Sequence, residues 1–457
     1  MDRLWQDLRF ATRTLTRTPG LTAVAILTLA LGIGANSAVF SLVNAVLIRP
    51  LPFIDPDRLV MVFEQAHGFD HGNVSGHEFV AWRKQSRSFN RMAMFNYVSF
   101  TLTGRGDPVT VNAQSVTADF FSVLGQPPLL GRAFRSGDDQ PDAPAMVILG
   151  HSLWTSRFGG DSSVIGRRII LDDAPFQVIG VMPARGDMDA DAWVPLDVVA
   201  EARKVGKHSN RVIARLEPGV SMQAAQTDLA AVARMIEREY PGANEGHGVN
   251  VVSLYKEVVG DVRRPFLVAL GAAAFVLLLA CANVAHLLLT RAAARQKEFA
   301  IRTALGAVRS TLVRQLVTES LLLSVVGGAL GLVIAMWLTD LLPALSAVHI
   351  PRLAELSVDR RVVAVTALLC LFTGLACGMV PALRASRPRL EVWLAEGTRT
   401  TAGPGRRLAG LLVVSEVAIA LMLLIGAGLT VKSFARLTRV DPGFDARNVL
   451  TVALPLP

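Results

Sequence analysis

Five long apolar tracts constrain this chain more than any other feature of its sequence. They cover residues 21–48, 265–289, 316–342, 362–383 and 408–431. Crossing roughly 30 Å of hydrocarbon takes about 20 helical residues, and every tract is long enough to do so. Apolar residues make up 51% of the chain and charged residues only 18%. The pattern indicates five transmembrane helices rather than the buried helices of a soluble core.

The segment before the first tract, residues 1–20, predicts an amphipathic helix that lies on the membrane surface. Its apolar face would carry Leu4, Leu8, Ala11 and Leu15, and another face would carry Arg9, Arg13 and Arg17. The tract that follows exceeds the about 7–15 residues of a signal-peptide core. We therefore interpret it as an uncleaved anchor.

Basic residues indicate the orientation of the tracts. Arginine and lysine collect in residues 1–20, 290–315 and 384–407, which fall on one side if all five tracts cross. The positive-inside rule places these segments and the N-terminus in the cytoplasm, and residues 343–361 in a short external loop. We expect a multi-pass protein of the cell (inner) membrane. The formal charge of +9 is dispersed along membrane flanks, where it favours the lipid bilayer and not nucleic acid as a partner.

Residues 49–264 are long enough to form a separate domain outside the cytoplasm. All the cysteines of the chain, Cys281, Cys370 and Cys377, fall in the apolar tracts, so no disulfide stabilises this domain. Its pattern alternates helices and strands. The predicted fold is therefore an α-helical membrane protein with an inserted extracytoplasmic α+β domain.

Several local patterns support this fold. Apolar residues recur at helical spacing from Ser75 to Phe89, and residues 118–125 predict a short helix that Gly125 ends. Residues 167–183 predict a hairpin with its turn at 172–175. A strand from Arg211, a Pro-Gly turn, an amphipathic helix and a further strand over 249–259 follow.

No catalytic, cofactor or metal site is predicted, so we expect the chain not to be an enzyme. Neighbouring glycines make a shared face unlikely for three histidines, which are read as loop residues: His67, His71 and His77. Three aspartates lack the glycine and glutamate of a calcium loop and indicate a polar turn: Asp187, Asp189 and Asp191. The sequence has no G-x-S-x-G or H-E-x-x-H motif.

The chain also lacks the P-loop that binds ATP in many transporters. Gly206 and Lys207 are followed by His208, where the motif needs serine or threonine, and no matching glycine precedes them. Any ATP hydrolysis of this kind must therefore come from a partner.

Glycines and acidic residues mark the expected contacts inside the membrane. Gly327 and Gly331 form one G-x-x-x-G pair, and Gly374 and Gly378 form another. They predict either packing within one bundle or a contact between subunits. Two acidic residues should have a structural role, either at helix interfaces or near a membrane boundary, where Arg314 or Arg407 could approach: Glu319 and Glu416.

The cytoplasmic segment 290–315 predicts a short helix after the second tract. Glu298 and Arg302 have the spacing of an i,i+4 pair, and the apolar contacts would come from Phe299, Ile301 and Leu305. A break at Gly306 and Ala307 precedes the next helix. Such a helix can dock in a groove of a cytoplasmic partner or rest on the membrane, and the pattern alone permits both.

The segment KEFAIRTALGAVRSTLVRQLVTESLLLSVVGGALGL, from Lys297, closely resembles the membrane core of MacB/FtsX-type ABC transporter permeases. LTLALGIGANSAVFSLVNAVLIRPLPFIDPDRLV, from Leu27, resembles the first span of that family. FFSVLGQPPLLGRAF, from Phe120, and VIGRRIILDDAPFQVIGVMP, from Val164, resemble its MacB-like periplasmic core domain. The resemblance implies that a separate cytoplasmic ABC ATPase pushes on residues 298–307. It thereby implies mechanotransmission, in which the external domain changes shape.

One departure from a four-span permease is the cytoplasmic linker 384–407 and the fifth tract. The VDPGFDARNVL that follows echoes IDPDRLV after the first tract, so residues 432–457 read as the start of a second external domain. The chain thus resembles the duplicated orphan-permease branch, truncated early in its second half. A second permease half or a homodimer would then be a further partner. The alternative function is a membrane-anchored binding or scaffold protein that acts without ATP.

Overall fold

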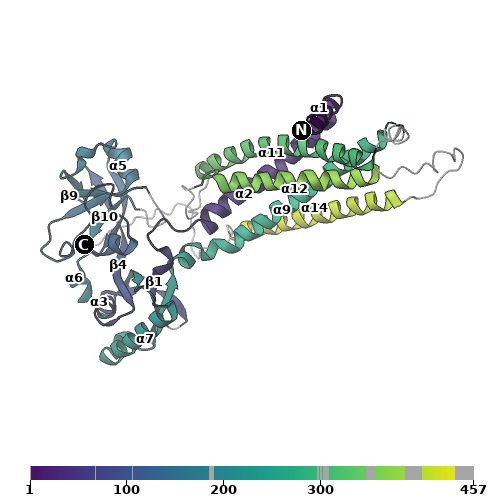
Figure 1. Cartoon of the computed structure of the whole chain (residues 1–457). Coiled ribbons are helices and arrows are strands. Elements are labelled where there is room, and N and C mark those ends of the chain that lie inside the picture. The colour runs from purple at the N-terminus through teal and green to yellow at the C-terminus, as the bar shows by residue number, and fades with distance from the viewer. Residues whose placement is uncertain are drawn as a thin grey trace. The chain divides into compact units, whose positions relative to one another are not determined.

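The computed structural model describes residues 2–66, 68–104, 106–184, 190–295, 298, 301, 308–345, 356–385 and 404–437. The chain divides into two units (Figure 1). The helical unit comprises residues 1–45, 265–348 and 354–457, and the α/β unit comprises residues 46–264 and 349–353.

Twelve strands of the described residues form one sheet in the α/β unit. Its main path runs β12-β1-β11-β4-β5-β10-β7-β9-β6, while β2 pairs with β1, β3 with β11, and β8 with β4 and β9. Most pairs are antiparallel, but β10 is parallel to β5 and β7 is parallel to β9. The strands are β1 Leu59–Ala66, β2 Phe69–Gly72, β3 Val74–Ser75, β4 Phe89–Thr103, β5 Val109–Val116, β6 Leu130–Gly131, β7 Met146–Leu149, β8 Arg168–Leu171, β9 Ala174–Val181, β10 Ala192–Pro195, β11 His208–Leu216 and β12 His247–Ser253.

The sheet is buried on both faces, because successive residues of β1 enter different cores. Val60 and Val62 pack with residues of α3 and α7, while Met61 and Phe63 pack with residues of α4. This alternation is the period of two that a strand imposes. The helices are α3 Gly76–Gln85, α4 Phe120–Leu124, α5 His151–Phe158, α6 Val198–Ala202, α7 Met222–Glu239 and α8 Pro241–Asn244, with 3-10 turns at Pro56–Arg58 and Ser162–Val164.

The helix predicted through Phe89 is wrong beyond Gln85. Ser75 begins α3 with a capping box to Glu78, but Ser86 is extended (φ −72°, ψ 141°) and ends the helix. Phe89 is the first residue of β4. Met92, Ala93, Met94 and Phe95 are all buried because alternate residues enter the two cores, as in a strand that is covered on both faces.

Of three other local predictions, two are confirmed and one is wrong in part. Gly125 ends α4 in the left-handed region (φ 68°), as expected. The predicted hairpin is β8 and β9, with Asp172 and Asp173 at positive φ in its turn. The strand expected over 249–259 is wrong after Ser253, because α9 begins at Leu254. Leu254 and Val258, four residues apart, both pack against the α/β core as one face of a helix does.

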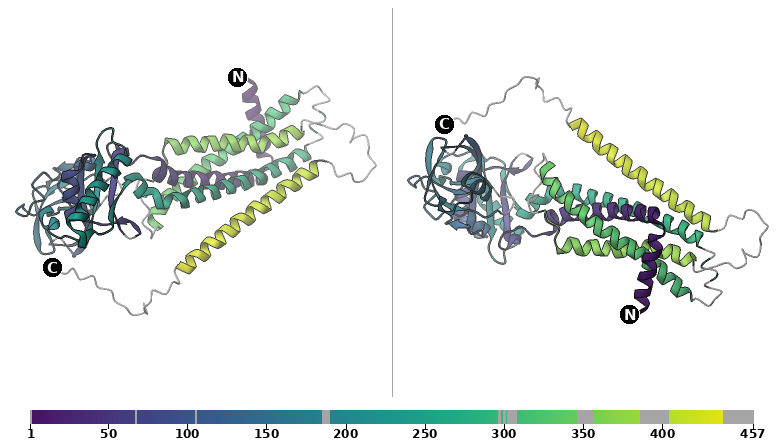
Figure 2. Two further views of the ribbon diagram at one scale, coloured as in Figure 1. Left: turned by 90° about the horizontal axis from the view of Figure 1, so that it is seen from below. Right: turned by 90° about the horizontal axis from the view of Figure 1, so that it is seen from above.

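The helices of the helical unit are α1 Asp2–Thr16, α2 Pro19–Val43, which continues as a π-helix Asn44–Ile48, α9 Leu254–Ala294, α11 Arg309–Leu345, α12 Arg360–Ala385 and α14 Pro404–Leu437. Of these, α2, α11 and α12 lie side by side (Figure 2). Helix α11 packs against both α2 and α12. Among the described residues, five helices are long and apolar enough to cross a membrane: α2, α9, α11, α12 and α14.

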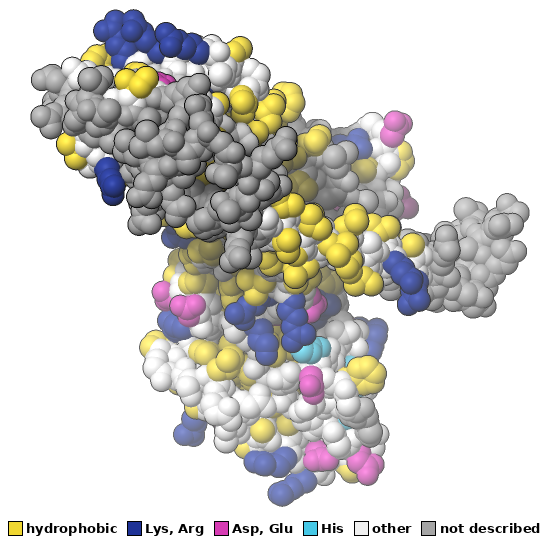
Figure 3. Space-filling model, turned by 90° about the vertical axis from the view of Figure 1, so that its right-hand side faces the viewer, with side chains coloured by type: hydrophobic (Ala, Val, Ile, Leu, Met, Phe, Trp, Pro, Cys, Tyr) yellow, Lys and Arg dark blue, Asp and Glu magenta, His cyan; other side chains and the backbone are white. Residues whose placement is uncertain are grey.

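The outer surface of these helices is apolar. Side chains such as Leu31, Val268 and Trp337 are more than half exposed, and apolar side chains gather over the helices (Figure 3). A surface of this kind is unfavourable in water and is compatible with lipid. The structure therefore agrees with the predicted fold, a helical membrane protein with an inserted mixed α/β domain.

Candidate functional site

Glycines bring α11 close to α2. A Cβ built on Gly34 would lie 2.9 Å from the carbonyl oxygen of Gly331, and a Cβ on Gly327 would lie 2.8 Å from the Cβ of Leu29. Any larger side chain at these positions would push the helices apart. Gly327 and Gly331 thus face α2 of the same chain.

The second glycine pair faces α11. A Cβ on Gly374 would lie 3.0 Å from the Cα of Leu321, and one on Gly378 would collide with the hydroxyl of Ser320. Ser320 Oγ also donates a hydrogen bond of 2.7 Å to the carbonyl oxygen of Gly374. All four glycines singled out from the sequence therefore contact other helices of the same chain.

Buried polar groups join α2 to the other helices. Asn36 Nδ2 donates to the carbonyl oxygen of Ala273 on α9 at 2.6 Å. The hydroxyl groups of Ser37 and Thr366 lie 2.8 Å apart and connect α2 with α12. In an apolar environment such hydrogen bonds favour one arrangement of the helices, because an unpaired polar group there is costly.

Arg295 joins three parts of the helical unit immediately after α9 ends. Its guanidinium donates to Glu298 Oε2 at 3.0 Å and to Glu319 Oε1 of α11 at 3.3 Å. It also lies 5.8 Å from the centre of the Phe10 ring of α1. Glu319 is only 2% exposed, so this arginine supplies the charge that its carboxylate needs.

The expected partner of Glu319 was Arg314, and that prediction is wrong. Arg314 Nε instead donates to Asp7 Oδ2 of α1 at 2.6 Å. Arg291 of α9 donates to the carbonyl oxygen of Thr14, also on α1. We call the set that connects α1, α9 and α11 the Arg295 network: Asp7, Phe10, Thr14, Arg291, Arg295, Glu298, Arg314 and Glu319. The side chain of Arg407 lies outside the described part of the chain, and Glu416 is half-buried on α14.

Helix α1 packs against the bundle by only part of its predicted apolar face. Ala11 and Leu15 are buried, whereas Leu8 is 39% exposed. The inner part of the face contacts α2 and α11. Its other end remains available to a membrane surface.

Two of the predicted coupling residues are described by the structure. Glu298 and Ile301 are both helical, and the side chain of Ile301 is 61% exposed. The other residues of this prediction lie outside the described residues: Phe299, Arg302, Leu305, Gly306 and Ala307.

The polar residues singled out in the α/β unit take structural positions. His71 is on β2, with Nε2 3.6 Å from Glu257 Oε2, and the ring of His77 lies 4.5 Å from that of Tyr240. These two residues are therefore not loop residues. Asp191 Oδ2 accepts a hydrogen bond of 2.9 Å from the backbone of Asn112. His67, Asp187 and Asp189 lie outside the described residues.

A different cluster, which sequence reasoning missed, brings together Glu64, His208 and His247. Burial, and then the charge of Glu78, raise the pKa of Glu64 to about 7, while His208 opposes this shift. The sequence contained only a weak local indication of this cluster. Each histidine is the first residue of a strand, and the glutamate is near the end of another.

Two protein-family models match the chain, one mainly over the α/β unit and the other over the helical unit. The model of the MacB-like periplasmic core domain matches residues 22–232, and that of the FtsX-like permease C-terminal domain matches residues 270–389. The pyoverdine export ATP-binding/permease protein PvdT of Pseudomonas entomophila (strain L48) is 28% identical over 277 residues, which are 59% of this chain and 40% of that protein. The macrolide export ATP-binding/permease protein MacB of Salmonella paratyphi A (strain ATCC 9150 / SARB42) is 25% identical over 284 residues, or 61% of this chain and 42% of that protein.

Two solved structures are similar to part of the chain. The periplasmic region of MacB from Actinobacillus actinomycetemcomitans has 17% identity and a TM-score of 0.35, covering 45% of this chain and 93% of that one. The extracellular domain of the noncanonic ABC-type transporter YknZ from Gram-positive bacteria has 15% identity and a TM-score of 0.34, covering 42% and 98%.

Apolar helices that could span a membrane, together with a MacB-like periplasmic core, define a multi-pass membrane protein of the permease class. More particularly, the chain belongs to the MacB/FtsX-type ABC transporter permeases. It spans about two fifths of the length of the curated relatives that it matches.

Proposed function

We propose that this chain is the transmembrane subunit of an ABC-type transport or mechanotransmission system, and that it couples a separate ATPase to a conformational change in its external domain. The observation that carries the proposal is the Arg295 network. Arg295 lies in the chain between α9 and the segment expected to meet the ATPase, and it contacts α1 and α11 at the same time.

The orientation is part of the proposal. The arginines of residues 1–20 and 290–315 favour the cytoplasmic side of the inner membrane. Ile301 would then be an exposed apolar side chain on the side where an ATPase is available. An exposed apolar residue on a short helix is a suitable anchor for a groove in a partner.

The packing of the helices supports transmission rather than a path for substrate. Displacing Arg295 would move Glu319 with it, because separating the pair would leave a buried carboxylate without its cation. The glycine contacts of Gly34 with Gly331 and of Gly378 with Ser320 would carry that motion from α11 to α2 and α12. Close-packed helices move as units because their interfaces deform little.

The proposal assigns ATP hydrolysis to an ATPase outside residues 1–457, which contain no Walker motif. The relatives named above are export proteins for pyoverdine and macrolides with ATP-binding parts. Export of small molecules is therefore one process that this permease could serve, and control of another protein by the external domain is a second.

Purification of the full chain in mild detergent tests the proposal. We expect a protein with a Walker motif to copurify, and the complex to hydrolyse ATP. Arg295→Ala should uncouple that hydrolysis from the external domain, measured as loss of the ATP-dependent change in its protease sensitivity. Arg309→Ala, at an exposed position at the start of α11, is the control. Recovery of the chain without an ATPase, and no response to ATP in membranes, would favour the scaffold function instead.

A further inference from the structure

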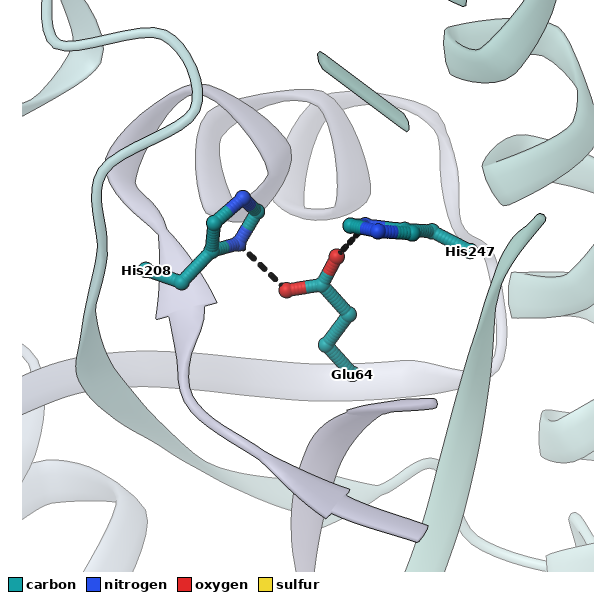
Figure 4. A group of neighbouring side chains, drawn as sticks. All are labelled: Glu64, His208 and His247. Carbon is teal, nitrogen blue, oxygen red and sulfur yellow. Dashed lines mark ion pairs between the residues drawn. The ribbon is translucent and has the colours of Figure 1, made fainter. Parts of the chain in front are cut away.

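Three residues from distant parts of the sequence converge in the α/β unit: Glu64 of β1, His208 of β11 and His247 of β12 (Figure 4). One possible ligand atom from each lies within 4.8 Å of the others. Nδ1 of His208 faces Glu64 Oε2, and Nδ1 of His247 faces Glu64 Oε1. The carboxylate thus lies between two imidazole rings.

The register of the sheet explains this convergence. His247 pairs with Ala66, two residues after Glu64, so both lie on the same face. His208 lies four residues before Val212, which pairs with Val62 on that same face of β1. The strand order β12-β1-β11 therefore supplies one histidine from each side of Glu64.

Two buried carboxylates lie at the cluster. Glu64 is 3% exposed, and Glu78, also buried, has its Oε2 3.7 Å from Nδ1 of His208. Within the described part of the chain, Glu64 Oε1 and His208 Nδ1 are buried and make no hydrogen bond of ordinary geometry. A divalent cation would balance the two carboxylates, which have little access to water.

We propose that Glu64, His208 and His247 bind a divalent first-row transition-metal ion, for which Zn²⁺ is the natural probe. Imidazole nitrogen and carboxylate oxygen are ligands that zinc uses, and three protein ligands leave a fourth position for water. Glu78 would hold the ligand His208 in place without binding the metal itself. Its Oε1 accepts from Asn244 Nδ2 at 2.8 Å and its Oε2 from the backbone of Ser75 at 3.1 Å, which fix the carboxylate beside His208.

Such an ion would link strands that are far apart in the sequence. His247 is the first residue of β12, and the last residue of β12 directly precedes α9. The bound metal would thus hold the strand that leads into α9 against β1 and β11. The proposed metal site is independent of any coupling to an ATPase. It differs from the expectation drawn from the sequence, which was that the chain has no metal site.

Calorimetric titration of the untagged, chelator-treated full chain in detergent with Zn²⁺ at neutral pH tests the proposal. We expect one ion per chain, a higher midpoint of thermal unfolding with Zn²⁺, and an absorption spectrum typical of nitrogen and oxygen ligands when Co²⁺ replaces it. Loss of a residue that only orients the metal ligands weakens metal binding by roughly 10–100-fold. Glu64→Gln, His208→Gln and His247→Gln should each weaken Zn²⁺ binding by more than this.

His151→Gln is the matched control, because His151 lies on α5, outside the cluster. It should bind Zn²⁺ as the wild type does. Three independent ligand variants keep the test decisive if one of them does not fold, and circular dichroism of each reports folding. The proposal is overturned if no stoichiometric binding occurs, or if folded ligand variants bind as tightly as His151→Gln does.

Discussion

Gly34 of α2 and Gly331 of α11 lie so close that a Cβ on either residue would approach the backbone of the other to 2.9 Å. This contact lies at the centre of the helical unit, where α11 packs between α2 and α12. Transmission through the helical unit requires these helices to move together, so their contacts give the first prediction.

We expect Gly331→Val to destabilise the helical unit by about 1–3 kcal/mol, the usual cost of overpacking a close contact. Gly271→Val on α9 is the control, because a Cβ there meets nothing within 4 Å. Thermal unfolding in detergent measures both. Equal effects of the two substitutions would show that the contact between α2 and α11 is not tight.

The ion pair of Arg295 with Glu319 gives a second prediction. Arg295→Ala would leave a buried carboxylate without its partner and should cost about 3 kcal/mol. Adding Glu319→Gln should restore most of this loss, because the amide carries no charge. A double-mutant cycle of unfolding measures the coupling, and independent, additive effects would refute it.

Asp228 of α7 gives a prediction on pH. Burial would raise the pKa of its carboxyl, but hydrogen bonds from Ser86 Oγ (2.6 Å) and from the backbone of Arg87 and Ser88 lower it overall. Asp228→Asn should therefore cost the α/β unit about 2 kcal/mol at neutral pH, as loss of hydrogen bonds to a charged group does.

The pH dependence of that loss follows from the lowered pKa of Asp228. Its contribution is fully present above the unfolded pKa of about 3.9 and disappears as pH falls through the folded value. The wild type and Asp228→Asn should thus converge in stability in acid. Glu239→Gln, at an exposed position of the same helix, should show no such trend. A difference that stays constant down to strong acid would contradict the assignment.

The sequence predicted the features that depend on local pattern. Length and apolarity are sufficient to identify α2 or α11, and Gly125 marks the end of α4 because few other residues adopt positive φ there. The end of α3 was misplaced because Phe89 continues the apolar spacing of a helix, although Ser86 and Ser88, both hydrogen-bonded to Asp228, lie beyond its end.

The candidate sites depend on tertiary contacts, and the sequence could not give these. Arg314 is five residues from Glu319 and was the obvious partner, but packing of α9 and α1 supplies Arg295 instead. Likewise, no spacing rule joins Glu64 to His208 and His247. Only the order of the strands β12, β1 and β11 brings them together.

Site-specific photo-cross-linking from Ile301 in living cells tests the central claim most directly. Ile301 is exposed and precedes α11, whereas Met222, 43% exposed on α7 of the α/β unit, is the control position. We predict that a photoreactive residue at 301 captures a protein with a Walker motif that hydrolyses ATP, and that the same residue at 222 does not. Capture of no ATPase from position 301, with the variant correctly inserted in the membrane, would contradict the account.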